Sequence, residues 1–260
     1  MVSARLILTL ICAVLFGCSA LTAPQARVFP PLVVLGPTDR AVASTIVLLA
    51  KERPYQWNGL VCAGVWVAPH RVLTAYHCII PAAFDELDQK ASDMGIDPPL
   101  NPVGQAVRFV NHDEWLANAD DDDTIAARYQ IRASVLKVDA DSDLALIDTE
   151  ATAPAYVEIA TTRVKMGQPV FTVGHPSGLA YSYSRGYVSN PIRTLSSKEL
   201  LYTQVNISIW HGNSGGGLYD DAGRLVGICS AMHSRNSSIS FFVSLGPINK
   251  LVAGLSLKFS

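Results

Sequence analysis

The chain is 260 residues long, 49% of its residues are hydrophobic, 16% are charged, and its formal net charge is −2. That composition excludes an intrinsically disordered protein, because disorder requires low hydrophobicity and a high net charge. Lys and Arg are not concentrated in any one stretch, so we expect no nucleic-acid partner. The length allows one large domain or two smaller ones, and the five cysteines are an odd number that needs an explanation.

Residues 1–17 have the pattern of a secretory signal peptide. Arg5 precedes an apolar run over 6–16 that is too short to span about 30 Å of hydrocarbon. The run ends in Leu-Phe-Gly-Cys, which resembles the bacterial lipobox and favours a lipoprotein acylated on Cys18; the alternative is cleavage after Ala20. Either route leads to an oxidising compartment. We therefore expect a protein of the bacterial cell envelope, lipid-anchored on the periplasmic side, or a secreted one.

A Pro-rich leader over 18–39 is followed, from residue 40 onward, by short apolar runs separated by turn signals. Twelve of these runs are predicted to be β-strands: Thr45–Ala50, Val61–Val67, Arg71–Tyr76, Ala106–Val110, Ser134–Val138, Leu144–Ile147, Pro169–Val173, Tyr181–Val188, Tyr202–Ile207, Gly217–Tyr219, Leu225–Cys229 and Ile239–Val243. No long amphipathic helix lies between them, which favours an all-β fold of barrels or sandwiches. Two helices are expected, one at Pro81–Met94 and a short C-terminal one at Ile248–Leu255.

The four consecutive aspartates 120–123 are expected to form a solvated loop. A calcium site is the alternative, but the run lacks the alternating ligand spacing and the glycine of a dedicated calcium loop. We therefore expect no metal and no cofactor.

Three short motifs contain residues that can do chemistry, and each is ambiguous alone. His77 ends the run Val-Leu-Thr-Ala-Tyr-His, Asp143 precedes Leu-Ala-Leu, and Ser214 lies within Gly-Asn-Ser-Gly-Gly-Gly. Such a histidine is often structural, such an aspartate can cap a strand, and glycines around a serine can mark only a tight turn. Their joint order is informative, because His, then Asp, then Ser is the chymotrypsin-type order and other triad folds use different orders.

On these motifs the chain resembles a trypsin-like serine protease in the style of the Deg/HtrA branch. Three longer segments also fit that branch: 59–78, 167–189 and 227–245. The resemblance covers roughly residues 40–256. It implies two six-stranded antiparallel β-barrels of the chymotrypsin type, at about 40–150 and 151–246, with a short C-terminal helix.

The resemblance also implies a role for each residue. Ser214 would be the nucleophile and His77 the base that takes its proton, while Asp143 would hold the imidazole in the correct tautomer. The backbone N–H groups of Gly212 and Ser214 would stabilise the oxyanion. The predicted function is an exported serine endopeptidase that acts on protein or peptide substrates through an acyl-enzyme, in envelope protein processing or quality control.

The resemblance further implies a disulfide between Cys62 and Cys78, which flank the histidine hairpin. Cys229 lies in an apolar strand and is expected to be a buried free thiol. With Cys12 lost in the signal peptide and Cys18 acylated, the odd number of cysteines reflects processing.

Substrate preference is expected from pocket residues Ser208, Ser230 and Met232. Since none is acidic, cleavage after Lys or Arg is disfavoured, and a small-to-medium apolar side chain is expected. Asn213 stands where zymogen-type relatives have the aspartate that pairs with a newly cut N-terminus, so no such activation is expected. Gly217 stands where the family usually has proline, which should loosen that strand a little.

Residues 82–104 form a long connection that looks like an insertion near the histidine, able to cover the cleft or touch a partner. No PDZ-like segment follows, so peptide-sensing activation and cage assembly are not expected. Two other functions compete. The first is a catalytically silent module with the protease fold. The second is an α/β-hydrolase esterase, which the Gly-x-Ser-x-Gly pattern at 212–216 allows, but which needs its acid and histidine after the serine.

Overall fold

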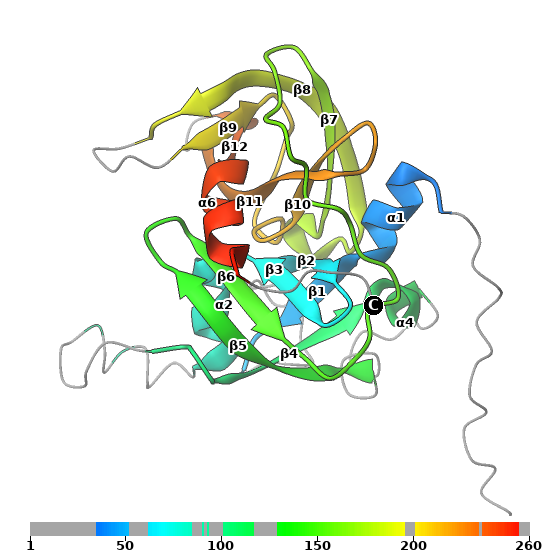
Figure 1. The fold of residues 1–260 in the computed structure, drawn as a ribbon, viewed down its shortest axis with the longest axis vertical. Helices are drawn as coiled ribbons and strands as arrows, with labels where there is room; N and C mark the ends of the chain where they lie inside the picture. The colour runs from blue at the N-terminus through cyan, green and yellow to red at the C-terminus, as the bar shows by residue number, and fades with distance from the viewer. Residues whose placement is uncertain are drawn as a thin grey trace, which may run out of the picture. The chain divides into compact units, whose positions relative to one another are not determined.

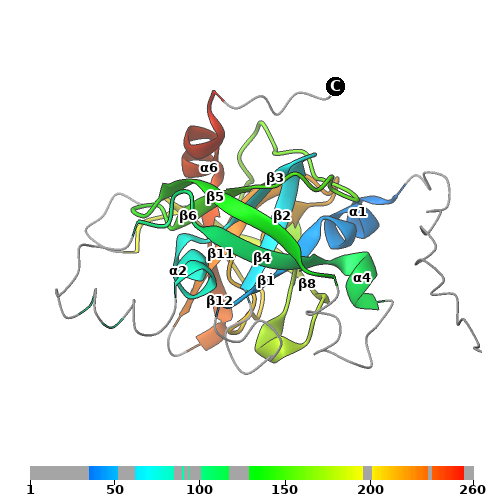
Figure 2. The same ribbon diagram turned by 90° about the horizontal axis from the view of Figure 1, so that it is seen from below.

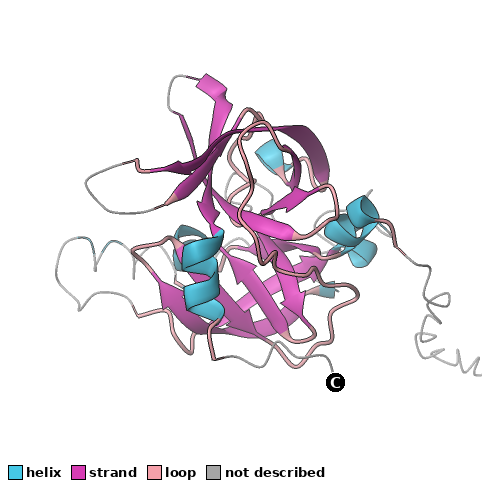
Figure 3. Cartoon of the chain, turned by 45° about the horizontal axis from the view of Figure 1, so that its top comes forward, coloured by secondary structure: helices cyan, strands magenta, loops and turns pink. Residues whose placement is uncertain are grey.

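The regular structure is dominated by strands in the computed structural model, which describes residues 35–51, 62–84, 90, 93, 101–116, 129–195, 201–233 and 236–254. Within these residues, twelve strands form two closed antiparallel barrels of six strands each (Figures 1 and 3). The first barrel contains β1 (Thr45–Leu49), β2 (Cys62–Ala68), β3 (Arg71–Thr74), β4 (Ala106–Asn111), β5 (Ile131–Asp139) and β6 (Leu144–Asp148). The second contains β7 (Pro169–Gly174), β8 (Ser182–Arg193), β9 (Tyr202–Val205), β10 (Gly217–Asp220), β11 (Leu225–His233) and β12 (Asn236–Ser244). The expected all-β fold of two six-stranded barrels is confirmed.

The first barrel has the strand order β1-β2-β3-β6-β5-β4 and closes because β4 also pairs with β1. Its interior is filled by apolar side chains that include Ile46, Trp66, Phe109 and Ile147. The indole N–H of Trp66 donates to Asn111 Oδ1 over 2.9 Å, which satisfies a polar group that would otherwise be costly to bury. All five residues of β1 are buried, which explains why this strand is a continuous apolar run in the sequence.

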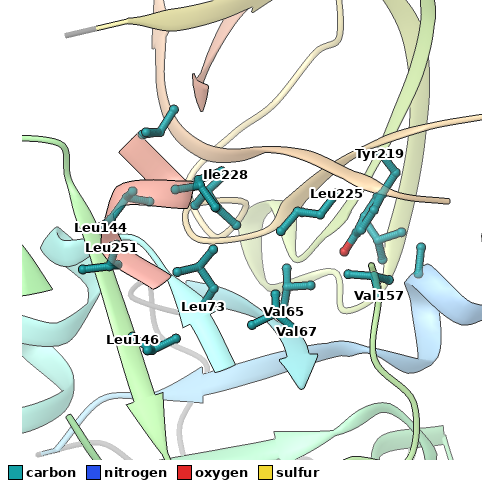
Figure 4. Close-up of a cluster of buried hydrophobic side chains, with 14 of the residues drawn as sticks. Val65, Val67, Leu73, Leu144, Leu146, Val157, Tyr219, Leu225, Ile228 and Leu251 are labelled. Atoms are coloured by element: carbon teal, nitrogen blue, oxygen red, sulfur yellow. The ribbon is translucent and has the colours of Figure 1, made fainter. Parts of the chain in front are cut away.

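The second barrel has the order β10-β11-β12-β9-β8-β7 and closes between β7 and β10. One cluster of buried side chains joins the two barrels: it includes Leu73 and Leu146 of the first and Tyr219 and Ile228 of the second (Figure 4). Because side chains of both barrels fill this shared core, it fixes the ends of β3 and β6 against β10 and β11.

The C-terminal helix α6 (Leu245–Val252) follows β12 directly and buries Leu245, Ile248, Leu251 and Val252. It therefore begins three residues before the predicted start, and the apolar side chains that it buries determine its position. Leu251 joins the core shared by the two barrels.

The predicted helix at Pro81–Met94 is confirmed only in part. The described residues Lys90 and Asp93 are helical, but residues 81–83 belong to a different helix, α2 (Tyr76–Ala83), after which Phe84 is extended. Pro81 lies inside it rather than at its start. A proline there removes one backbone hydrogen bond, but the helix persists through burial of side chains such as Ile79 against the first barrel. Most of the remaining predicted helix, and most of the connection 82–104, lies outside the described residues.

Two further α-helices were not predicted. They are α1 (Pro37–Ala43), which crosses the expected end of the leader at residue 39, and α4 (His112–Leu116), directly after β4. The two lie side by side (Figures 1 and 2). The expectations for residues 1–34, including the signal peptide and acylation of Cys18, and for the aspartates 120–123 lie outside the described residues. Among the described residues, no helix has both the length and the apolarity needed to cross a membrane.

Gly217 at the start of β10 is explained by its neighbour Tyr219. A Cβ at position 217 would lie 2.3 Å from Tyr219 Cζ and 2.4 Å from its hydroxyl oxygen. The tyrosine ring is fully buried in the core shared by the barrels. The ring thus occupies the space that a larger residue would need.

We expect Gly217→Ala to lower the free energy of unfolding by about 1–3 kcal/mol, because the added methyl group overpacks the core. Gly246→Ala in α6 is the matched control, since nothing lies within 4 Å of a Cβ at that position. Urea denaturation of the three proteins measures the difference. Equal loss in both variants would show that Tyr219 does not exclude a side chain at position 217.

Candidate active site

His77 lies at the second position of α2, just after β3 ends at Thr74. The Thr74 hydroxyl donates to the carbonyl of Ala63 in β2 over 2.7 Å, which fixes the strand end that precedes the histidine. The side chain of His77 is 46% exposed. The local structure therefore presents the imidazole at the surface on a rigid strand-to-helix connection.

Asp143 lies at the end of the turn between β5 and β6 and directly faces His77. The distance from His77 Nδ1 to Asp143 Oδ2 is 2.9 Å and to Oδ1 3.0 Å. The backbone N–H of His77 also donates to Oδ1 over 3.0 Å. Asp143 has a left-handed backbone with φ 53°, a conformation that is strained for a residue other than glycine. The carboxylate thus orients the histidine through its ring and its backbone.

Ser230 in β11 of the second barrel supports the same carboxylate. Its hydroxyl donates to Asp143 Oδ2 over 2.6 Å. Burial by itself raises the pKa of the Asp143 carboxyl, but the hydrogen bond and charge of His77 and the Ser230 hydroxyl together outweigh it, so the pKa lies below its ordinary value. Asp143 is consequently ionised at neutral pH and accepts hydrogen bonds from both barrels.

The other aspartates near the motif have different partners. Asp139 accepts from the backbone N–H and the hydroxyl of Ser142 over 3.1 and 2.9 Å, which shapes the turn before Asp143. Asp148 pairs with Arg71 across β3 and β6. Of these three carboxylates, Asp143 is the one that the structure pairs with His77.

Ser214 lies in a loop between β9 and β10 that is fixed to both barrels. Its carbonyl accepts from Ala63 N over 2.7 Å, and the N–H of Gly215 donates to the carbonyl of Cys229 over 2.8 Å. Gly215 has φ +81°, and a Cβ there would lie 2.2 Å from both Ala63 O and Thr74 Oγ1. A glycine is therefore needed for the serine loop to pack against the strand that leads to His77.

Ala63 contacts both sides of the site: it binds the Ser214 carbonyl through its N–H and the Thr74 hydroxyl through its carbonyl. These bonds bring the serine loop and the histidine to one place. Within the described residues the Ser214 hydroxyl makes no hydrogen bond to His77. In enzymes generally, hydrogen bonds between catalytic groups are often long until a substrate is bound.

The backbone at residues 211–212 has a defined orientation. The carbonyl of His211 accepts from the N–H of Ser177 over 2.8 Å. Because a trans peptide is planar, the N–H of Gly212 points in the opposite direction to that carbonyl. Gly212 has φ 102°, which few other residues can adopt. In the part of the chain that the structure describes, no backbone hydrogen bond uses the N–H of Gly212 or of Ser214.

A disulfide joins Cys62 to Cys78, with a Cα–Cα distance of 5.9 Å and a sequence separation of 16. It connects the start of β2 to α2, next to His77, and it is the pairing that the resemblance implies. The side-chain atoms of Cys62, His77 and Cys78 that could bind a metal ion lie within 4.8 Å of one another. Both sulfurs, however, are bonded to each other in the disulfide. Cys229 is a buried free thiol, and burial together with the charge of Asp143 raises its pKa, so it is unreactive.

Removal of the disulfide by the double substitution Cys62→Ala and Cys78→Ala should lower the free energy of unfolding by about 3 kcal/mol, because the unfolded chain regains the freedom of the closed loop. Urea denaturation with and without a dithiol reductant measures the loss. The reductant should destabilise the wild type and leave the double variant unchanged. A wild type that is insensitive to full reduction would contradict a stabilising role.

The three expected pocket residues have different environments. Ser208 is exposed, Met232 is half-buried against the core of the second barrel, and Ser230 is half-buried with its hydroxyl on Asp143. Sequence reasoning placed Ser230 in the pocket and missed its bond to the aspartate. His175, which none of the three short motifs of the sequence analysis includes, is buried completely between the two barrels.

Two six-stranded antiparallel barrels, with a His–Asp pair and a glycine-rich serine loop where they meet, define the chymotrypsin-like class of folds. Among solved structures, the Rv3671c protease from M. tuberculosis in its active form is similar at 18% identity and TM-score 0.60, over 92% of this chain and 96% of that one. An HtrA-type protease solved with a tripeptide is similar at 18% identity and TM-score 0.60, over 83% of this chain and 60% of that one. Likeness at this identity shows the fold.

The family model for the trypsin-like peptidase domain matches residues 62–228, more than half of the chain, and the chain belongs to that family. Curated relatives are probable periplasmic serine endoproteases described as DegP-like. That of Hahella chejuensis is 30% identical over 123 residues, 45% of this chain and 26% of the relative. That of a Marinomonas species is 32% identical over 138 residues, 49% of this chain and 29% of the relative. The match thus spans less than a third of these relatives, and together with the family model it supports a Deg/HtrA-type trypsin-like protease domain.

Proposed function

We propose that the protein is an exported serine endopeptidase that hydrolyses peptide bonds through His77, Asp143 and Ser214. The observation that supports this most is the His77–Asp143 pair, in which one carboxylate accepts from the imidazole Nδ1, the histidine backbone and the Ser230 hydroxyl. A carboxylate held in this way fixes the imidazole with its other nitrogen directed outward, as a general base requires.

In the proposed reaction, the hydroxyl of Ser214 attacks the scissile carbonyl while His77 Nε2 accepts its proton. Asp143 stabilises the imidazolium that forms. The tetrahedral oxyanion accepts hydrogen bonds from the N–H groups of Gly212 and Ser214. Among the described residues, neither N–H group donates to a backbone carbonyl. His77 then returns the proton to the leaving amine. Water, activated by the same histidine, hydrolyses the acyl-enzyme and regenerates the serine.

The residues expected around the substrate side chain support an uncharged preference. Ser208, Ser230 and Met232 offer no carboxylate to pair with a Lys or Arg side chain, and the neighbouring Ile209 is buried and apolar. A small-to-medium apolar side chain before the cleaved bond is therefore the proposed preference. Digestion of a peptide library by the purified mature chain tests it: cleavage after such residues is expected, and cleavage only after Lys or Arg would contradict it.

An envelope location is supported by the relatives, whose names describe them as periplasmic. We propose export through the signal peptide over 1–17 and acylation of Cys18. The intact mass of the mature protein distinguishes the two forms, since an acylated chain begins at Cys18 with the mass of its lipids and a soluble chain begins after Ala20. With this location, the proposed role is in envelope protein processing or quality control.

A further inference from the structure

His175 follows β7 and is completely buried between the two barrels. Its Nε2 lies 3.0 Å from the carbonyl of Ile46 in β1 of the first barrel. Its Nδ1 accepts from the backbone N–H of Tyr181 over 3.0 Å, at the other end of the segment that joins β7 to β8. One imidazole thus closes the segment 175–181 and binds it to the opposite barrel.

These two contacts define the protonation state of the ring. A backbone N–H can only donate, so Nδ1 must be the acceptor, and the proton on Nε2 is donated to the carbonyl of Ile46. Only the neutral imidazole satisfies both partners. Burial lowers the pKa of His175 to about 4, the bond to Ile46 opposes that shift, and the charge of His112 adds to it. His175 therefore keeps both contacts at neutral pH.

The segment that His175 closes has an unusual backbone. Ser177, Gly178 and Tyr181 all have positive φ, at 52°, 81° and 58°. Two of the three are not glycine, and such conformations persist only where surrounding contacts impose them. The contact from Tyr181 N–H to His175 is one such constraint, because it fixes the end of the segment.

Packing of the Tyr181 ring provides a second constraint, and part of it comes from the helix α4 that follows the first barrel's β4. The ring packs edge-on against His175, with centroids 4.9 Å apart, and against His112 of α4, with centroids 4.6 Å apart. Trp115 of the same helix lies 6.5 Å away. The segment 175–181 of the second barrel is thus held by β1 and α4 of the first barrel.

The middle of this segment contacts the serine loop. The N–H of Ser177 donates to the carbonyl of His211, and this bond turns the N–H of Gly212 the opposite way. Without it, the peptide between His211 and Gly212 could rotate and place its carbonyl where the N–H now points. The orientation of one oxyanion donor therefore depends on where Ser177 lies.

We propose that His175 is a positioning residue for the oxyanion-binding site: by closing the segment 175–181 against the first barrel, it places Ser177 so that the His211 carbonyl is held and the Gly212 N–H faces the substrate. This role rests on the proposed peptidase function. It also explains how a donor in the second barrel is aligned with a base, His77, in the first.

Three substitutions at His175 test the proposal in the full mature chain. His175→Leu removes both hydrogen bonds and should lower kcat, per titrated active site, by about 10²–10³-fold, the effect of losing one oxyanion donor. KM should stay within about threefold. His175→Asn keeps an acceptor where Nδ1 lies and should restore most of kcat. His175→Gln places its amide near the Nε2 position, where it should not accept from the Tyr181 N–H. Its kcat should therefore resemble that of His175→Leu.

The control for simple destabilisation is Asp220→Ala. This buried aspartate accepts hydrogen bonds from Arg224 and from its own hairpin turn, so its loss weakens the fold and should leave kcat per active site unchanged. Affinity for a peptide boronic acid, whose tetrahedral adduct needs the oxyanion donors, should fall in His175→Leu by the same factor as kcat. It should not fall in Asp220→Ala.

An unchanged kcat per active site in His175→Leu would overturn the proposal, and so would a His175→Asn variant no better than His175→Gln. If His175→Leu does not fold, the comparison of His175→Asn with His175→Gln takes its place as the test. The amide NMR signal of Gly212 provides a readout that does not require activity: it should shift in His175→Leu and His175→Gln and stay in His175→Asn. A wild type without activity would contradict the proposed function, while this signal would still decide the role of His175.

Discussion

Replacement of Ser214 by alanine is expected to lower kcat for peptide hydrolysis by about 10⁶-fold, with little change in KM. The reason is that the serine oxygen forms the covalent bond of the acyl-enzyme, and no neighbouring group replaces it. Substrate binding relies on the pocket and the backbone, which the substitution leaves intact. Initial rates with a fluorogenic peptide, taken over a range of concentrations, give kcat and KM separately.

The matched control is Ser208→Ala, which removes a hydroxyl from the expected pocket rather than from the reacting group. It should alter KM or the preferred side chain and leave kcat within about tenfold. If Ser214→Ala retained more than a few per cent of the wild-type kcat, the nucleophile would have to be another residue.

The second large effect is expected for Asp143→Asn, which should lower kcat at neutral pH by about 10⁴-fold. An amide can donate to Nδ1 of His77, which favours the tautomer whose proton is on Nε2. That tautomer cannot accept the proton of Ser214. The substitution also removes the negative charge that stabilises the imidazolium. Rates are measured as for Ser214→Ala and report the fall in kcat. The NMR signal of the downfield imidazole Nδ1 proton should disappear, which reports the change of tautomer.

The substitution Ser230→Ala distinguishes the effect of the Asp143 charge from the effect of the hydrogen bond that Ser230 donates to its carboxylate. It removes one of the hydrogen bonds to the carboxylate and leaves both contacts with His77. Loss of a hydrogen bond to a charged group costs about 1.5–3 kcal/mol, so we expect kcat to fall by about 10- to 150-fold and to remain far above that of Asp143→Asn. Equal losses in the two variants would mean that the carboxylate depends on Ser230 for its position.

The strands could be predicted from the sequence because their burial is periodic or continuous and turn residues separate them. The run that became β1 and the Leu-Ala-Leu of β6 are examples: both are buried throughout most of their length. The helix α2 was not predicted, because the mixed polarity that indicates a surface helix lies in 81–94, whereas α2 itself is mostly apolar. Its true position depends on which side chains pack against the first barrel, and that requires the barrel.

The His–Asp pair could be inferred from motif order, whereas its surroundings could not. Ser230 and Asp143 are 87 positions apart in the chain, and His175 and Ile46 are 129 apart. Both contacts cross from one barrel to the other, so they exist only after the two barrels pack together. A local pattern gives no signal for such contacts, and the sequence around His175 alone is equally consistent with an exposed turn.

Labelling by a fluorophosphonate, read by intact mass, tests the central claim most directly, because this reagent reacts with a serine that an adjacent base activates. The mature wild type should gain the mass of one adduct, located on Ser214 by peptide mapping. Ser214→Ala should gain none, and His77→Ala should react far more slowly. A folded wild type that stays unlabelled, or a Ser214→Ala variant that labels as fast as the wild type, would contradict the account.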